Sequence, residues 1–181
     1  IEPIGHSAAI QRLREQVKRI AQHDSWVLIA GEPGSGRETF ARYLHAHSSR
    51  RDRPFIEVGV SAISRGNAAP ELFGRERDGV IEYGRLEQAS GGTLFLDEVA
   101  DMDLEAQAQL VGALDTGSFI RIGGSAPVTI DVRVIAATQR DLHKAVEEGN
   151  FREDLFYQLN VVPLLVPPLR DNREDTPELL E

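Results

Sequence analysis

Eight residues near the start of the chain have the types and spacing of a phosphate-binding loop. They are Gly31, Glu32, Pro33, Gly34, Ser35, Gly36, Arg37 and Glu38, and Thr39 follows them. Small residues let successive backbone N–H groups turn toward an anion, and a helix N-terminus adds partial positive charge. The match to G-x-x-x-x-G-K-[ST] is incomplete, because Arg37 replaces the Lys and Glu38 replaces the Ser or Thr. The stretch predicts phosphate binding, and a plain glycine turn after a buried strand is the alternative.

A second group with chemical potential is the acid pair Asp97 and Glu98, which ends the apolar run Gly92-Thr93-Leu94-Phe95-Leu96. A carboxylate in the position of Asp97 can hold a Mg²⁺-bound water, and Glu98 beside it can polarise the water that attacks a γ-phosphate. Two surface acids after a strand are the alternative. Together with the glycine loop upstream, the pair indicates a nucleoside triphosphate site.

Arg37 affects how well such a site would work. It supplies positive charge for the β- and γ-phosphates, but its planar fork is bulkier than an ammonium group and differs in shape. A positional error of about 1 Å near reacting atoms can cost on the order of 100-fold in rate. We therefore expect nucleotide binding, with slow rather than rapid hydrolysis.

These groups must be positioned by alternating strands and helices. We expect helices near 8–21, 39–48, 104–114 and 142–148, a short extended piece at 119–122, and buried strands near 26–30, 54–58, 92–97, 132–137 and 161–166. This alternation predicts an α/β fold with a parallel sheet covered on both faces. Ligands bind beyond the carboxyl ends of such strands, and the glycine loop, the acid pair and Thr138-Gln139 all follow strands. They can therefore share one site.

Composition sets broader limits. The 181 residues carry a net charge of −9 and no cysteine. The acidic balance disfavours a surface that wraps nucleic acid, and the basic cluster Arg50 to Arg53 is interpreted as a solvated loop. Without cysteine there is no disulfide framework and no Cys-based zinc site, which suits the cytoplasm. No apolar run approaches the ~18 residues of a membrane span, so no membrane association is expected.

Several blocks together resemble a known family. GEPGSGRE, ELFG, GRLEQASGGTLFLDEVADM, VRVIAATQRDL and FREDLFYQLNVVPLLVPPLR occur in this order. They are similar to the central AAA+ (sigma-54 interaction) domain of bacterial enhancer-binding proteins, ATP-driven activators that remodel the sigma-54 RNA polymerase holoenzyme. The resemblance implies a P-loop NTPase core with a five-stranded parallel sheet, binding of ATP or ADP with Mg²⁺, and an ATP site shared between subunits of a ring or dimer. It also implies that Ile4 and Gly5 line the adenine pocket.

The same resemblance sets an expectation for the rest of the protein. Residues 1–181 are expected to be the α/β subdomain of a longer two-component response regulator, without the small helical lid that completes such domains. The family's sensory domain and its helix-turn-helix DNA-binding domain are not part of this sequence. DNA is therefore an expected partner only through a domain absent from this chain.

The chain departs from the family's pattern at five places. Two are at residues already described: Arg37 replaces the phosphate-loop Lys, and Gln139 replaces an Asn whose amide positions water or the γ-phosphate. The third is Gly59, at the position of an Asn that restrains the catalytic Glu in the family. Of two arginines that reach into a neighbouring subunit's site, Arg152 matches, but Gln158 takes the second position.

The fifth departure concerns the sigma-54 contact. The family's GAFTGA loop should follow Glu71-Leu72-Phe73-Gly74, but residues 75–83 are too short for it and lack the motif. In this respect the chain is closest to GAFTGA-lacking response regulators of the NtrX type. RNA polymerase remains a candidate partner, whereas a contact with sigma-54 is not expected.

Two functions remain open. In the first, the domain is a slow ATP hydrolase, in which Asp97 holds the metal, Glu98 orients the water, and Gln139 and a neighbour's Arg152 complete the site. In the second, it is a non-catalytic nucleotide-binding module whose oligomeric state controls DNA binding. A P-loop small-molecule kinase is a third reading, but the sequence offers no arginine cluster for a second substrate's phosphate.

Overall fold

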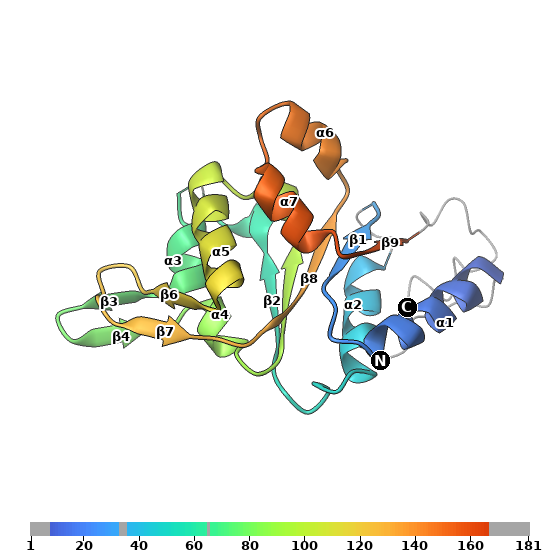
Figure 1. The fold of residues 1–181 in the computed structure, drawn as a ribbon, viewed down its shortest axis with the longest axis horizontal. Coiled ribbons are helices and arrows are strands. Elements are labelled where there is room, and N and C mark those ends of the chain that lie inside the picture. The colour runs from blue at the N-terminus through green and yellow to red at the C-terminus, as the bar shows by residue number, and fades with distance from the viewer. Residues whose placement is uncertain (1–7, 33–35, 65, 167–181) are drawn as a thin grey trace.

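The computed structural model describes residues 8–32, 36–64 and 66–166 (Figure 1). Its centre is a five-stranded sheet in the order β2-β5-β8-β1-β9, and every pair of neighbouring strands is parallel. The strands are β1 (Val27–Ala30), β2 (Phe55–Gly59), β5 (Thr93–Asp97), β8 (Arg133–Thr138) and β9 (Val162–Leu165). The predicted α/β fold with a five-stranded parallel sheet is confirmed.

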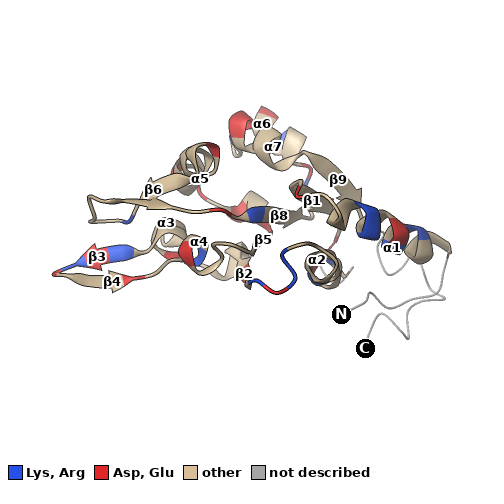
Figure 2. Ribbon diagram, turned by 60° about the horizontal axis from the view of Figure 1, so that its bottom comes forward, with Lys and Arg blue, Asp and Glu red and all other residues tan. Residues whose placement is uncertain are grey.

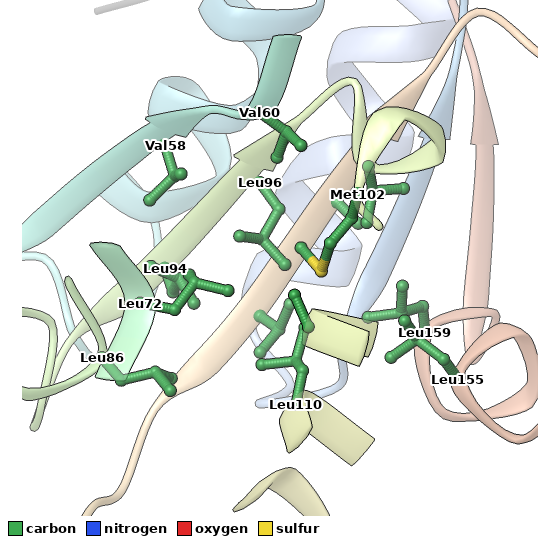
Figure 3. Packing of buried hydrophobic residues seen from close by; sticks show 14 of the residues in the cluster. Val58, Val60, Leu72, Leu86, Leu94, Leu96, Met102, Leu110, Leu155 and Leu159 are labelled. Carbon is green, nitrogen blue, oxygen red and sulfur yellow. The ribbon is translucent and has the colours of Figure 1, made fainter. Parts of the chain in front are cut away.

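Each face of the sheet is covered by helices because side chains alternate along a strand. On one face, Leu28, Leu94 and Leu96 pack in a cluster with helices of the chain's middle and end (Figure 3). These are α3 (Ala68–Phe73), α4 (Arg85–Gln88), α5 (Leu104–Thr116), α6 (Leu142–Glu147) and α7 (Glu153–Leu159). On the other face, Ile29 and Phe95 pack with α1 (Ala8–Ala21) and α2 (Arg37–Ala46). The sheet is thus packed between two hydrophobic clusters, one on each face.

Two small hairpins project together beyond one end of the sheet (Figures 1 and 2). One is formed by β3 (Arg75–Arg77) and β4 (Val80–Glu82), the other by β6 (Ser118–Ile120) and β7 (Pro127–Thr129). Backbone hydrogen bonds join them, since Ile122 donates to Gly74 and accepts from Glu76. Arg121 reinforces the joint by pairing with both carboxylate oxygens of Glu87, at 2.8 Å each, and with Glu76. The hairpins therefore form one unit.

The basic cluster after α2 is only partly a solvated loop. The guanidinium of Arg50 is largely buried and pairs with both carboxylate oxygens of Asp24 and with Asp131, besides donating to the carbonyl of Gly92. Arg50 thus ties the segment after α1 to the starts of β5 and β8. This contact supports the interpretation that the cluster does not bind nucleic acid.

Sequence patterns located the long elements well and missed the short ones. The helix over 8–21 and the five strands were found to within about two residues, as expected for boundaries. The short helices α3, α4 and α7 and the β3–β4 hairpin were not predicted, and of the β6–β7 hairpin only the extended piece at 119–122 was expected, which overlaps β6. They have three to seven residues each, too few for a periodic pattern to be recognised. Among the described helices, none is both long and apolar enough to cross a membrane.

Burial of His45 in α2 predicts a pH dependence of stability. Nε2 of this side chain lies 3.0 Å from the carbonyl of Arg53 and Nδ1 lies 2.8 Å from the hydroxyl of Thr93, so the neutral ring satisfies both contacts. Burial, ahead of the charges of nearby arginines, lowers the pKa of His45 below its ordinary value of 6.5. The unfolded chain therefore binds this proton first, and stability is lost as the pH falls below 6.5.

We expect His45→Gln to remove this part of the pH dependence of the free energy of unfolding, measured with urea between pH 7.5 and 5. Each unit of pKa difference corresponds to about 1.4 kcal/mol. The matched control is His143→Gln, which replaces an exposed histidine that pairs with Glu147 on α6. Equal slopes for wild-type protein and the His45 variant would contradict the assignment.

Candidate functional site

The strand ends bring the predicted site residues together. Ala30 lies beside Thr138 and Ala137 beside Asp97 in the registers of β1, β8 and β5. The N–H of Gly31 donates to the carbonyl of Thr138 at 3.0 Å, which joins the end of β1 to the end of β8. The first glycine of the loop and the acid pair thus lie at one edge of the sheet, as predicted.

The described part of the glycine loop ends at the start of α2. Gly36 has a φ of 94°, a left-handed conformation that glycine adopts without strain, and Arg37 is the first residue of the helix. Pro33, Gly34 and Ser35, as well as Ile4 and Gly5, lie outside the described residues. Their roles in binding nucleotide stay predictions.

Arg37 does not extend toward solvent. Its side chain is only 7% exposed, and NH1 donates to Glu98 Oε1 at 2.7 Å and to the carbonyl of Gly31 at 3.1 Å. NH2 lies 2.9 Å from Asp97 Oδ1, in a contact that is close enough for an ion pair but is not aligned as a hydrogen bond. One guanidinium therefore contacts both acids and the end of β1. We call this group of Arg37, Asp97, Glu98 and the Gly31 carbonyl the Arg37 clamp.

The backbone of Glu98 is strained. Its φ of 59° is left-handed, which for a residue other than glycine costs about 1–2 kcal/mol. The strain turns the side chain inward, where Oε1 accepts from the backbone N–H of Gln139 at 2.8 Å as well as from Arg37. The second oxygen, Oε2, is buried without a hydrogen-bond partner. A buried carboxylate oxygen in this state is available to accept from a ligand or a water.

Burial also changes the chemistry of Asp97. Loss of water around its carboxylate is the main cause that raises the pKa of Asp97 above its usual value. The charge of Arg37 opposes the shift and that of Glu98 adds to it. Glu98 and Asp97 therefore repel each other at this edge, and Arg37 is the cation that reduces their repulsion.

The described arrangement does not fit a magnesium ion. Carboxylate oxygens are the right chemistry for Mg²⁺, which binds oxygen at about 2.0–2.1 Å and keeps several waters. However, the guanidinium of Arg37 already contacts Asp97 Oδ1 and Glu98 Oε1. A metal bound through these two oxygens would need Arg37 to withdraw first, so the predicted role of Asp97 stays a prediction.

The remaining loop residues lie around this core. Glu38 is exposed and pairs with Arg42 one turn along α2, at 3.0 Å. Glu32 is exposed, and Thr39 is half-buried in the first turn of α2. In the described conformation the charge of Glu38 acts on the acid pair, where it adds to the causes that raise the pKa of Asp97.

The two positions of the predicted inter-subunit arginines behave differently. Arg152 precedes α7, is 44% exposed, and pairs with both oxygens of Asp154. Gln158, six residues further along, turns inward and donates to the carbonyl of Val111 on α5 at 3.1 Å. The first position is accessible to a neighbouring molecule, whereas the second joins two helices of the same chain.

Sequence reasoning missed the residue that holds Arg152 in place. Gln107 on α5 is fully buried, and its Oε1 accepts from the backbone N–H of Arg152 at 2.8 Å. Its amide nitrogen donates to the carbonyls of Met102 and Asn150. A polar side chain on the apolar face of a predicted helix was the available signal, because such groups are nearly always hydrogen-bonded when buried.

This fold and this edge define the chain as a P-loop NTPase domain of the AAA+ class. A strand, a glycine-rich turn and a helix precede an acid pair at the end of β5, and β8 lies between that strand and β1 in the parallel sheet. The described residues reproduce that arrangement, apart from the loop centre at 33–35.

The comparisons give the family. Residues 3–165 match the model of the sigma-54 interaction domain, so the chain belongs to this family. The chain is 46% identical over 182 aligned residues to the DNA-binding transcriptional regulator NtrC of Rhizobium meliloti strain 1021, covering 98% of this chain and 38% of that protein.

Solved structures agree with this assignment. NtrX from Brucella abortus in complex with ATP is 44% identical with a TM-score of 0.92, covering 98% of this chain and 41% of that one. Its complex with ADP gives a TM-score of 0.91, covering 96% and 39%. The P-loop NTPase domain of the sigma-54 transport activator from E. coli is 25% identical with a TM-score of 0.61, covering 92% and 99%. The predicted resemblance to NtrX-type proteins is confirmed, and the chain spans about two fifths of the NtrC and NtrX proteins.

Gly59, the position of the family's restraining Asn, has room for a side chain. It pairs with Asp97 in the register of β2 and β5, its φ of −82° suits any residue, and a Cβ would have no neighbour within 4 Å. Gly92, at the start of β5, is the opposite case, because a Cβ there would lie 2.0 Å from the carbonyl oxygen of Pro54. A side chain therefore has room at Gly59, beside the acid pair at the end of β5. It has no room at Gly92, next to the start of β5.

We expect Gly59→Ala and Gly59→Asn to leave the midpoint of urea unfolding unchanged or slightly raised, because the backbone is already extended. Gly92→Ala is the matched comparison and should destabilise the protein by about 1–3 kcal/mol through overpacking. A loss for the Gly59 variants as large as that for Gly92→Ala would show that the space is not available.

Proposed function

We propose that this chain is the nucleotide-binding AAA+ domain of an NtrX-type transcription regulator, with residues 1–181 forming its α/β subdomain. The observation that carries the proposal is the joining of Gly31, Arg37 and the acid pair at one edge of the sheet. The complexes of Brucella abortus NtrX with ATP and with ADP support the same ligands here. DNA binding would belong to another part of the regulator. This domain would assemble with copies of itself into a ring or a dimer.

Residue roles follow from the positions in the structure. The glycine loop from Gly31 to Thr39 would surround the phosphates with backbone N–H groups at the start of α2, and Arg37 would supply positive charge. Glu98 would orient the attacking water, with Gln139 beside it. Arg152, which faces outward, would complete the site of a neighbouring subunit.

Hydrolysis by this site would be slow. Glu98 Oε1 already accepts from Arg37 and from Gln139, so the carboxylate that should polarise water is occupied on one side. Only one of the two inter-subunit arginine positions holds an arginine, and a lost arginine finger costs roughly 10³–10⁵ in rate. These features also favour the second candidate, a non-catalytic module whose occupancy by ATP or ADP sets the oligomeric state.

The hairpins argue against remodelling of sigma-54 polymerase. The β3–β4 hairpin takes the place where the family's contact loop is expected, and its two strands have three residues each. Arg121 fastens this hairpin to the β6–β7 hairpin through Glu76 and Glu87. This hairpin lacks the GAFTGA motif and is shorter than the family's contact loop. Its ion pairs to the second hairpin also oppose a movement with the nucleotide cycle.

The first test is a calorimetric titration of ATP and of ADP into the wild-type protein and into Glu98→Gln. We expect both proteins to bind both nucleotides, because Glu98 is assigned to water rather than to phosphate. Phosphate release should fall by about 100-fold in the variant if the domain is a slow ATPase. Equal release by both proteins would favour the non-catalytic module, and no binding of either nucleotide would contradict the proposal.

The second test is transcription from a sigma-54-dependent promoter with purified components. We expect no stimulation by the regulator that contains this domain, because the contact loop is missing. A GAFTGA-bearing activator on the same template provides the positive control. Robust formation of open complexes would overturn this part of the proposal.

A further inference from the structure

The Arg37 clamp connects three elements through one buried cation. Arg37 begins α2, Gly31 follows β1, and Asp97 and Glu98 end β5. The side chains of the clamp are 7% exposed at Arg37, 29% at Asp97 and 9% at Glu98. The guanidinium is therefore an integral part of the site rather than a surface group that happens to approach it.

The shape of the guanidinium explains how one residue reaches both acids. Its two terminal nitrogens point in different directions, so NH1 contacts Glu98 while NH2 contacts Asp97. A lysine ammonium in this position would be a single point charge on a flexible stem and could not span the pair in the same way. The clamp thus depends on the feature that separates this chain from the family's phosphate-loop pattern.

The clamp and a divalent ion compete for the same oxygen atoms. A metal ion at Asp97 Oδ1 would have to displace NH2 of Arg37, which lies 2.9 Å from this atom. It would also stand next to a fixed positive charge in a partly buried place, where like charges are poorly screened. Asp97 and Glu98 therefore have a cation already, supplied by the chain itself.

Resting on the proposed nucleotide binding, we propose that Arg37 replaces the divalent metal ion at the acid pair, so that this domain binds ATP or ADP without a metal requirement. A guanidinium has five N–H donors, and the hydrogen bonds to Gly31 and Glu98 use two of them, both on NH1. The remaining donors and the backbone N–H groups at the start of α2 are the positive groups offered to phosphate oxygens. Asp97 and Glu98 repel phosphate less because Arg37 balances part of their charge.

The experiment compares the affinity for ATP in excess Mg²⁺ with that in EDTA, by calorimetry, for three proteins. The wild-type protein is expected to give the same affinity in both conditions. Arg37→Lys should bind ATP at least about tenfold more tightly with Mg²⁺ than without it, because the acids are released for the metal. Arg42→Lys is the matched control on the same helix, since its side chain pairs with Glu38 and Glu57 at the rim, and it should behave like wild type.

A second measurement needs no nucleotide and no turnover. Mn²⁺ is titrated into each protein and its free fraction is followed by electron paramagnetic resonance. We expect binding by Arg37→Lys and none by the wild-type protein or by Arg42→Lys. Thermal unfolding of each protein confirms that the comparison is between folded chains.

The outcomes separate this inference from the proposed function. Wild-type binding of ATP that tightens about tenfold with Mg²⁺, or wild-type binding of Mn²⁺, would overturn the inference and leave nucleotide binding established. The inference would also be overturned if Arg37→Lys bound ATP equally well with and without Mg²⁺ and did not bind Mn²⁺. Arg37 would then not be the cause of the missing metal site. If no protein binds ATP, the proposed function fails, and the Mn²⁺ titration alone decides whether Arg37 excludes the metal.

Discussion

The Arg37 clamp is the interaction on which the rest of the site depends. Two carboxylates from adjacent residues are held at a partly buried sheet edge, where burial and the charge of Glu98 raise the pKa of Asp97. Removing one partner from such a buried group typically destabilises a protein by about 3–5 kcal/mol, because an uncompensated charge remains. Arg37 therefore has a structural role in joining α2 to β1 and β5 and a chemical role in setting the charge of the site.

The parts of the fold that could be predicted from sequence are those in which one strong pattern decides the structure. The apolar runs that form β1, β5 and β8 are typical of buried strands, and their alternation with helices indicates a parallel sheet. The positions of Gly31, Asp97 and Gln139 at one edge then follow from the rule that carboxyl ends of parallel strands meet. The sequence alone was thus enough to place these three residues in one site.

The rest of the site depends on side-chain geometry, which the spacing of residues in the sequence does not reveal. The sequence identified Arg37 as unusual, but only the structure shows that its fork contacts Asp97 and Glu98 instead of extending from the loop. It also shows that the backbone N–H of Gln139, rather than its side chain, holds Glu98. Gln107 was missed for a related reason, because its hydrogen bonds to Arg152 and Asn150 join residues far apart in the chain.

On the function proposed above, two departures from the family's pattern at opposite ends of the sheet remove the same capacity, the remodelling of polymerase. A domain that remodels polymerase needs acids free to respond to the nucleotide and a contact loop free to move in response. Here the acids are occupied by Arg37, and the hairpin at the loop's position is fastened by Arg121 to its neighbour. Loss of either feature would remove selection for the other, since an uncoupled loop gains nothing from rapid hydrolysis. Arg152 stays exposed beside α7, so this position is not part of the proposed loss and remains accessible to a neighbouring molecule.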